Sequence, residues 1–423
     1  MNSLEVNTKN YNLVLTDILL CLAIIFSVLS QIEPIENITR PIMYVMWILL
    51  IIVGCIKKKG KVFIDNFAQL FIIAYVLFVA FCIITSFVNS DHLKANYIRV
   101  LIIPLLVSII GCMYSDIDKK VINIIGRVYI YCSFLFGLWV QLTYFKSYNS
   151  WLNQRLYVFV QKNSAGQIWI SAVFVAFFLL EYRYKIERIF ILLISLYLLV
   201  ITGFSQCRTA LLGFAVGVIA YAILRAKHKV RLIILLVAAI LALWMIPRTR
   251  TFIEQALVLN KYAGADMNTF TSGRIDKYFK AFNVILDSPF IGVGKYYVDN
   301  SYILILAESG IIGFAIIEFV WIKKLILCLT YKGDISNKSF LFVVSFFYII
   351  ESLLEGYPPF GPGVSSFFFW LISSVLINQA ISSLNKESMP EPKTDTDYIG
   401  DVPSKRKKEK VKMDSPSLNK RKN

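Results

Sequence analysis

Residues 271–313 read TSGRIDKYFKAFNVILDSPFIGVGKYYVDNSYILILAESGIIG and join a charged segment to an apolar one. Between positions 275 and 286 the apolar residues recur every three or four positions, which predicts a helix with one apolar face and one basic face. Thr271 or Ser272 is the expected N-cap, and Pro289 marks the expected end of the helix. This pattern is typical of a helix that lies along a membrane surface.

Arg274 is expected in the first turn of this helix. Unpaired backbone N–H groups and the positive end of the helix dipole favour an anion there, and a guanidinium adds bidentate contacts to a phosphate. Gly292 and Gly294 then loosen the backbone before Asp299 leads into the next apolar segment. We therefore expect a functional site in this stretch.

The composition places the whole chain in the membrane class. Of its 423 residues, 57% are hydrophobic and 17% are charged, and the mean hydropathy is +0.64. These values exclude an ordinary soluble protein and predict an all-α, polytopic integral membrane protein. Six of the seven cysteines lie in apolar runs and are expected to pack as small hydrophobic residues, whereas Cys207 lies near the candidate site. The two histidines have no acidic cluster beside them, so we expect no metal and no other cofactor.

About twelve segments are long and apolar enough to cross a hydrocarbon core, which needs roughly 17–25 residues each. The first segment is too long for a signal peptide, and no small-residue cleavage site follows it, so we expect an internal span. Residues 1–384 are expected to form the transmembrane domain, with one long external loop at about 247–299. The expected spans are residues 12–32, 39–56, 67–88, 97–114, 121–145, 165–182, 187–205, 209–226, 230–246, 300–322, 339–356 and 364–384.

Lysine and arginine residues cluster in alternate loops, among them 57–61, 225–231 and the pair Lys323-Lys324. Positively charged loops of membrane proteins face the cytoplasm, so an even number of spans places both termini there. Residues 385–423 form a polar, basic tail that we expect to be disordered. The tail either binds anionic lipid or a partner, or only anchors the topology. The net charge of +17 is therefore mostly cytoplasmic and does not indicate binding of nucleic acid.

The long external loop carries an excess of basic residues, and its helical periodicity favours a site over a disordered segment. Arg208 lies between two apolar runs with little room for a loop. An arginine inside a span costs about 2.5–3.5 kcal/mol, so Arg208 needs a partner or a wet cavity. It either snorkels to the interface or shares an external compartment with Arg274. Glu308, inside the next apolar run, is a further costly charge that we expect to pair with an arginine.

Five short fragments in a fixed order carry a resemblance to a known family. They are Ser205–Gly213 (SQCRTALLG), Ser272–Arg274 (SGR), Pro289–Gly294 (PFIGVG), Asp299–Tyr302 (DNSY) and Glu308–Gly313 (ESGIIG). In order and spacing, and in the large external loop between them, they resemble the O-antigen ligase and Wzy-type polysaccharide polymerase superfamily. Outside these fragments the chain is similar to this superfamily only in span number and topology.

The resemblance implies a metal-independent, inverting glycosyltransferase that uses polyprenyl-diphosphate-linked glycans at the outer face of the bacterial plasma membrane. The two arginines that are thought to hold the diphosphate in this family match Arg208 and Arg274. Where the ligases have a histidine, proposed to activate the acceptor hydroxyl, this chain has Asp299. This departure favours the polymerase branch of the family.

The chemistry of these residues is compatible with such a reaction. Two guanidiniums can neutralise the charge that develops on a diphosphate leaving group. Asp299 can accept the proton of the acceptor hydroxyl, an effect typically worth about 10²–10⁴ in rate, provided that burial raises its pKa above about 3.9. It can equally cap the next helix or pair with Lys295. Asn300 and Tyr302, which follow it, are expected to contact the substrate, Tyr302 by stacking on a sugar.

Two further pairs of polar residues are candidates for substrate binding. Lys162 and Asn163, at the outer start of the sixth expected span, either bind a sugar phosphate or cap the helix. Arg248 and Arg250, at the start of the external loop, either line the route of the lipid diphosphate or only add charge for solubility.

These observations together predict a polymerase of polyprenyl-diphosphate-linked oligosaccharide repeat units that makes capsule, exopolysaccharide or O-antigen. The first alternative is an O-antigen-type ligase, which transfers such a glycan to another acceptor. The second is a transporter or flippase for lipid-linked sugars, although the unusual charges gather at one outer face rather than at the membrane midplane. The expected partners are the lipid-linked donor and acceptor, the bilayer, and a chain-length regulator and flippase of the same pathway.

Overall fold

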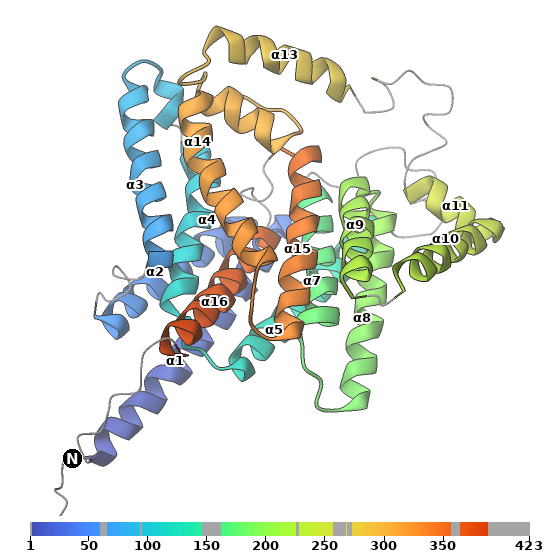
Figure 1. Ribbon diagram of the computed structural model, residues 1–423, viewed down its shortest axis with the longest axis horizontal. Helices are drawn as coiled ribbons and strands as arrows, with labels where there is room; N and C mark the ends of the chain where they lie inside the picture. The colour runs from blue at the N-terminus through green and yellow to red at the C-terminus, as the bar shows by residue number, and fades with distance from the viewer. Residues whose placement is uncertain are drawn as a thin grey trace, which may run out of the picture. The chain divides into compact units, whose positions relative to one another are not determined.

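The computed structural model describes residues 2–59, 66–93, 95–145, 162–225, 228–256, 268, 273–356 and 364–387. Every regular element in these ranges is helical (Figure 1), as the composition predicts. The chain divides into two units, Met1–Ser382 and Ser383–Asn423, and the site discussed below belongs to the first. The basic tail from residue 388 onward lies outside the described residues.

The α-helices are α1 (Asn2–Leu29), α2 (Glu36–Lys58), α3 (Asn66–Ser86), α4 (Ala95–Met113), α5 (Lys119–Tyr144), α7 (Lys162–Phe174), α8 (Lys185–Phe204), α9 (Arg208–Arg225), α10 (Lys229–Met245), α11 (Pro247–Ala256), α13 (Arg274–Asp287), α14 (Ser301–Leu329), α15 (Ile335–Leu354) and α16 (Val364–Glu387). Short helical turns complete them: η1 (Glu33–Ile35), η3 (Ser90–Leu93) and the π-helical turn η4 (Val175–Leu179).

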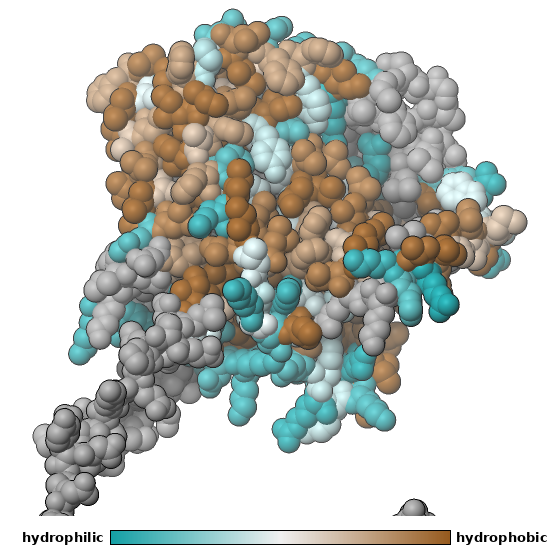
Figure 2. Space-filling model, viewed as in Figure 1, coloured by the Kyte–Doolittle hydropathy of each residue, from teal (hydrophilic) through white to brown (hydrophobic). Residues whose placement is uncertain are grey.

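Seven helices of the described part are long and apolar enough to cross a membrane. They are Glu33–Lys58, Phe67–Ser86, Lys119–Tyr144, Lys185–Phe204, Ser301–Leu329, Ile335–Leu354 and Ser366–Ser383. Three shorter apolar helices, Leu15–Leu29, Ile103–Met113 and Arg208–Leu224, coincide with further expected spans. Apolar side chains cover most of the flank of the helices in Figure 2, as lipid contact requires. The chain is therefore a multi-pass membrane protein, while the count of twelve spans stays a prediction.

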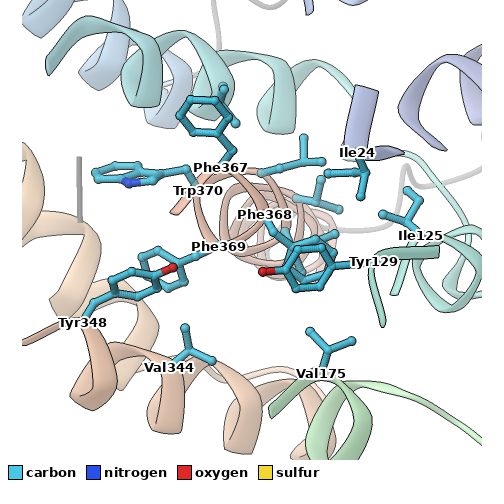
Figure 3. Close-up of a cluster of buried hydrophobic side chains, with 14 of the residues drawn as sticks. Ile24, Ile125, Tyr129, Val175, Val344, Tyr348, Phe367, Phe368, Phe369 and Trp370 are labelled. Carbon is cyan, nitrogen blue, oxygen red and sulfur yellow. The ribbon is translucent and has the colours of Figure 1, made fainter. Parts of the chain in front are cut away.

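The core is organised around the aromatic residues Phe367–Trp370 of α16, all at most 6% exposed. Four consecutive buried residues face every side of a helix, so α16 has neighbours all round (Figure 3). Phe368 stacks on Tyr129 of α5 with ring centroids 4.3 Å apart, and Phe369 lies 4.9 Å from Tyr348 of α15. These contacts bury the large aromatic surfaces that dominate core energetics.

Ion pairs gather the loops that follow α2, α4, η4 and α14 at one end of the helices. Lys58 Nζ lies 3.1 Å from an oxygen of Asp116. Lys119 Nζ lies 2.5 Å from Glu181 and 3.8 Å from Asp334. These are the alternate loops to which the distribution of lysine and arginine assigns the cytoplasmic side, and that assignment stays a prediction.

Lys324 differs from the expectation of a paired, exposed cytoplasmic lysine. Lys323 is exposed, but Lys324 lies on the buried face of α14 and has no exposed surface. Its Nζ donates hydrogen bonds to Ser374 Oγ (2.7 Å), the Trp370 carbonyl oxygen (3.0 Å) and Ser108 Oγ (3.2 Å). The same ammonium lies 4.2 Å from the centre of the Trp370 ring. The prediction was wrong for this residue because a run of two lysines on a helix places one on each face.

α14 is broken at Gly310, which has φ +60° and ψ −171°. The loop of residues 289–294, which follows α13, runs alongside the break and bonds to the backbone groups that the helix leaves unpaired there. The hydrogen bonds run from the N–H groups of Val293 to Ala307 (3.0 Å), Gly294 to Glu308 (2.9 Å), Ile311 to Pro289 (2.9 Å) and Ile312 to Phe290 (3.3 Å). The Asn89 side chain also donates to the Val293 carbonyl (2.7 Å). These hydrogen bonds fix the path of the chain from α13 into α14.

Glycine is required where the two segments meet. A Cβ at Gly310 would lie 2.3 Å from the Phe290 carbonyl carbon, and a Cβ at Gly292 (φ +71°) would lie 2.4 Å from Glu308. Both residues also have positive φ, a region that is unfavourable for residues with a Cβ. The fragments PFIGVG and ESGIIG are therefore two halves of one structural contact.

Gly310→Ala is expected to destabilise the protein far more than Gly273→Ala. Gly273 has φ +77°, but no heavy atom of the described residues lies within 4 Å of its Cβ position, so we expect alanine there to meet mainly the backbone penalty of roughly 1–2 kcal/mol. Alanine at Gly310 adds a clash with backbone, which we expect to bring the loss above about 4 kcal/mol. Melting of the two variants in detergent tests this, and equal midpoints would contradict the contact between 289–294 and the break.

Candidate functional site

α13 places Arg274 at its first position, as the sequence predicts. The residue before it is Gly273, which has a left-handed conformation and no side chain to cap the helix. The expected caps, Thr271 and Ser272, lie outside the described residues. The helix ends at Asp287, also as expected. Arg274 therefore lies in the first turn of α13, where the Asp276 N–H donates to Asn268 Oδ1 (3.3 Å).

The Arg274 guanidinium lies between two carboxylates from different parts of the chain. Its Nη2 donates to Glu355 Oε1 at 3.2 Å, at the end of α15. Its Nε lies 3.6 Å from Asp299 Oδ2, in the loop before α14. The side chains of Arg274, Asp299 and Glu355 are 20%, 17% and 8% exposed, so this pairing is shielded from water but still open on one side.

α13 makes further polar contacts to the same loop. The Tyr278 hydroxyl donates to the Asp299 carbonyl oxygen at 2.8 Å, and Lys277 Nζ lies 3.4 Å from Asp299 Oδ2. Its apolar side chains Phe279 and Phe282 point outward and are 68% and 50% exposed. α13 crosses the top of the view in Figure 1, above the start of α14. Its polar face is thus docked and its apolar face is exposed, while its position along a membrane surface stays a prediction.

Two amide–carboxylate pairs join α7 to α15 behind Glu355. Asn163 Nδ2 donates to Glu355 Oε2 at 2.9 Å, and Gln167 Nε2 donates to Glu351 Oε2 at 3.0 Å. Both helices contribute residues four positions apart, so the pairs stack on neighbouring turns. Glu351 has no exposed surface, and its Oε1 has no hydrogen-bond partner among the described residues.

Arg208 is the first residue of α9, after a tight turn of three residues from the end of α8. Its neighbours on both sides contact the site: the Cys207 thiol donates to the Lys162 carbonyl oxygen (2.9 Å), and Thr209 lies beside Glu355. Gln206 completes the turn with φ +54°. The sequence predicted this turn correctly, and it brings the start of α9 to the start of α7.

Cys207 and Glu355 are two titratable groups at this end of α9, and their electrostatic environments differ. Burial raises the pKa of the Cys207 thiol to about 12, although Lys162 acts against the shift. Cys207 is therefore a neutral packing residue rather than a nucleophile. Burial also raises the pKa of Glu355, while the Arg274 guanidinium lowers it and the Asp299 carboxylate raises it further. The Arg274 guanidinium thus favours the carboxylate form of Glu355.

The other predicted substrate-binding residues lie elsewhere or have structural partners. Arg250 pairs with Glu254 (2.7 Å) on α11 and lies over the Trp244 ring (5.4 Å), and Arg248 is exposed on the same helix. These contacts of Arg250 are local to α10 and α11.

Asn300 is the N-cap of α14 and accepts a hydrogen bond from the Ile303 N–H (3.0 Å). Its amide also donates to the Leu353 carbonyl (3.0 Å). Tyr302 interacts with Trp321 and Ser352 inside the helices. Asn300 and Tyr302 thus hold the start of α14 against α15, next to the site.

The sequence analysis missed Glu355 and Glu351. The signal was present, since two glutamates four residues apart at the end of an apolar span are costly unless they have partners. Glu308 also differs from expectation: its Oε1 accepts the Tyr296 N–H at 3.4 Å instead of pairing with an arginine. In the described ranges no group of three or more histidine, cysteine, aspartate or glutamate residues is placed to hold a metal.

Acidification is expected to loosen α13. Arg274 lowers the pKa of the buried Glu355, so docking of α13 is complete above that pKa and weakens as the pH falls through it. Because burial raises this pKa, the loss begins at a higher pH than for an ordinary glutamate. Hydrogen exchange of residues 274–287, corrected for its intrinsic pH dependence, measures the effect. Glu355→Gln should remove the pH dependence, and an unchanged dependence in this variant would contradict the assignment.

The comparison with known proteins agrees with the geometry. Residues 190–317, which include Arg208, Arg274 and Asp299, match the family model described as O-antigen ligase. No curated protein matches the chain. The part of the chain that carries both arginines and the broken helix is therefore similar to the O-antigen ligase family, as its motifs predict.

Proposed function

We propose that this protein polymerises polyprenyl-diphosphate-linked oligosaccharide repeat units at the outer face of the bacterial plasma membrane, for capsule, exopolysaccharide or O-antigen. The observation that carries the proposal is the position of Arg274. It is held between Glu355 and Asp299 in a segment similar to the O-antigen ligase family. That family supports a membrane glycosyltransferase with lipid-linked glycan substrates.

In the proposed reaction an acceptor hydroxyl attacks the anomeric carbon of the donor sugar. The bond between that carbon and the diphosphate oxygen breaks, and the polyprenyl diphosphate leaves with the electron pair. Arg274 and Arg208 neutralise the charge that develops on the leaving group. One of the two carboxylates beside Arg274, Asp299 or Glu355, takes the hydroxyl proton. Attack opposite the leaving group inverts the anomeric carbon.

The carboxylates around Arg274 suit an anion site that must release its product. A guanidinium buried alone is costly, so a resident carboxylate holds it in place while the donor is absent. A diphosphate then exchanges with Glu355 and Asp299 rather than meeting an unordered side chain. The position of the arginine is thus set before binding, which reduces the ordering cost.

An O-antigen-type ligase is the second candidate, because the matching family model is described as O-antigen ligase. It would use the same donor site and transfer the glycan to a different acceptor. The absence of the family's histidine at Asp299 favours the polymerase.

Arg274→Ala and Arg208→Ala are each expected to abolish long-chain polymer in cells, with a loss of at least about 10²-fold in rate, because a fixed charge on the leaving group is removed. Lys280→Ala, on the exposed side of α13, is the matched control and should retain polymer. Gel analysis of surface and lipid-linked glycans measures the outcome. Long polymer in both arginine variants would overturn the proposal.

The lipid-linked intermediate that accumulates without the protein separates the two candidates. Single repeat units on the lipid indicate the polymerase, and long lipid-linked chains indicate the ligase.

A further inference from the structure

Glu355 is held more closely to Arg274 than Asp299 is, with N–O distances of 3.2 Å and 3.6 Å. Asp299 shares its carboxylate between two cations, Arg274 and Lys277. Two cations therefore compete with a substrate hydroxyl for the Asp299 carboxylate. Glu355 pairs with Arg274, which is the arginine that the proposed function assigns to the diphosphate.

From this geometry, and resting on the proposed function, we infer that Glu355 is the catalytic base that accepts the proton of the acceptor hydroxyl. The donor itself activates this base. When the diphosphate binds Arg274, the guanidinium turns from Glu355 Oε1, and that oxygen keeps its lone pairs while Asn163 still holds Oε2.

The surroundings of Glu355 strengthen the base once the cation has turned away. The charged and polar groups that face it are Arg274 on α13, Asp299 in the loop before α14, Asn163 on α7, Thr209 on α9 and Glu351 one turn below on α15. Once Arg274 has turned away, the Asp299 carboxylate still raises the pKa of Glu355. Its pKa, already raised by burial, then rises further as the donor binds.

The proton balance closes within one cycle. The hydroxyl oxygen forms the new glycosidic bond, its proton moves to Glu355 Oε1, and the polyprenyl diphosphate leaves with the electrons of the broken bond. When the product leaves, Arg274 returns to Glu355 and lowers its pKa, so the proton passes to solvent. Glu351 lies buried one turn below Glu355, and Gln167 holds it in place.

The test compares Glu355→Gln with Asp299→Asn in the full-length protein reconstituted in nanodiscs. Turnover is measured with lipid-linked repeat units isolated from a host that lacks this protein, and binding is measured with polyprenyl diphosphate alone. We expect Glu355→Gln to lower kcat by about 10²–10⁴. The Kd for polyprenyl diphosphate should stay within about threefold, because the glutamine side-chain oxygen can still accept the Arg274 hydrogen bond and hold the guanidinium in place. Asp299→Asn should lower kcat by less than about tenfold, because it leaves the base in place.

The inference is overturned if Glu355→Gln keeps kcat within about tenfold, if it loses diphosphate binding along with turnover, or if Asp299→Asn shows the larger loss of kcat. Arg274→Ala separates this failure from that of the proposed function. If Arg274→Ala loses binding while Glu355→Gln stays active, only the role of Glu355 is contradicted. If Arg274→Ala still binds the diphosphate and turns over, both the role of Glu355 and the proposed function are contradicted.

A second measurement needs no variant to fold. Calorimetry of polyprenyl diphosphate binding to the wild-type protein, in two buffers of different ionisation enthalpy, counts the protons taken up. We expect no more than a small fraction of a proton to be taken up near neutral pH, since Glu355 must stay a carboxylate in the donor complex to accept the hydroxyl proton. Uptake of a whole proton on binding would contradict the mechanism, because the base would already be protonated before the acceptor hydroxyl reacts.

Discussion

The pairing of the Arg274 guanidinium with the Glu355 carboxylate is the interaction on which the site depends. It joins α13 to the end of α15, and the two residues are 81 positions apart in the sequence. A buried carboxylate without a cation is costly, so Glu355 draws α13 toward the helices, and α13 in turn covers the Asp299 loop. The Tyr278 hydroxyl and Lys277 add to the same docking. One ion pair therefore both assembles the site and orients its arginine.

The break of α14 at Gly310 supplies the second constraint. A helix that stops and resumes leaves backbone groups unpaired, and the segment 289–294 pairs with them by four hydrogen bonds. That segment is tethered to α13 at one end and leads to Asp299 at the other. The glycine-rich fragments shared with the O-antigen ligase family therefore act through the backbone, by placing the residues that carry charge. Asn300, as the cap of α14, fixes the neighbouring position in the same way.

The sequence predicted the all-helical membrane class, the amphipathic helix from Arg274 to Asp287 and the tight turn before Arg208, because each depends on local spacing. It predicted the role of Arg274 from a motif, and the structure adds two partners that no local pattern shows. Glu355 and Glu351 were missed because their partners, Asn163 and Gln167, lie on α7, far away in the sequence. Lys324 was assigned to a loop because a charge count does not show which face of a helix is buried. In each case the partners and the burial of the residue depend on contacts between segments that are far apart in the sequence.

The account depends most directly on coupling between Arg274 and Glu355, which a double-mutant cycle measures. The free energy of unfolding in detergent would be compared for the wild type, Arg274→Gln, Glu355→Gln and the double variant. Each single variant leaves a partly buried group without its partner, so the double variant should be less destabilised than the sum, with a coupling of about 1–3 kcal/mol. Additivity within about 0.5 kcal/mol would show that the two residues do not interact, and the site described here would not exist.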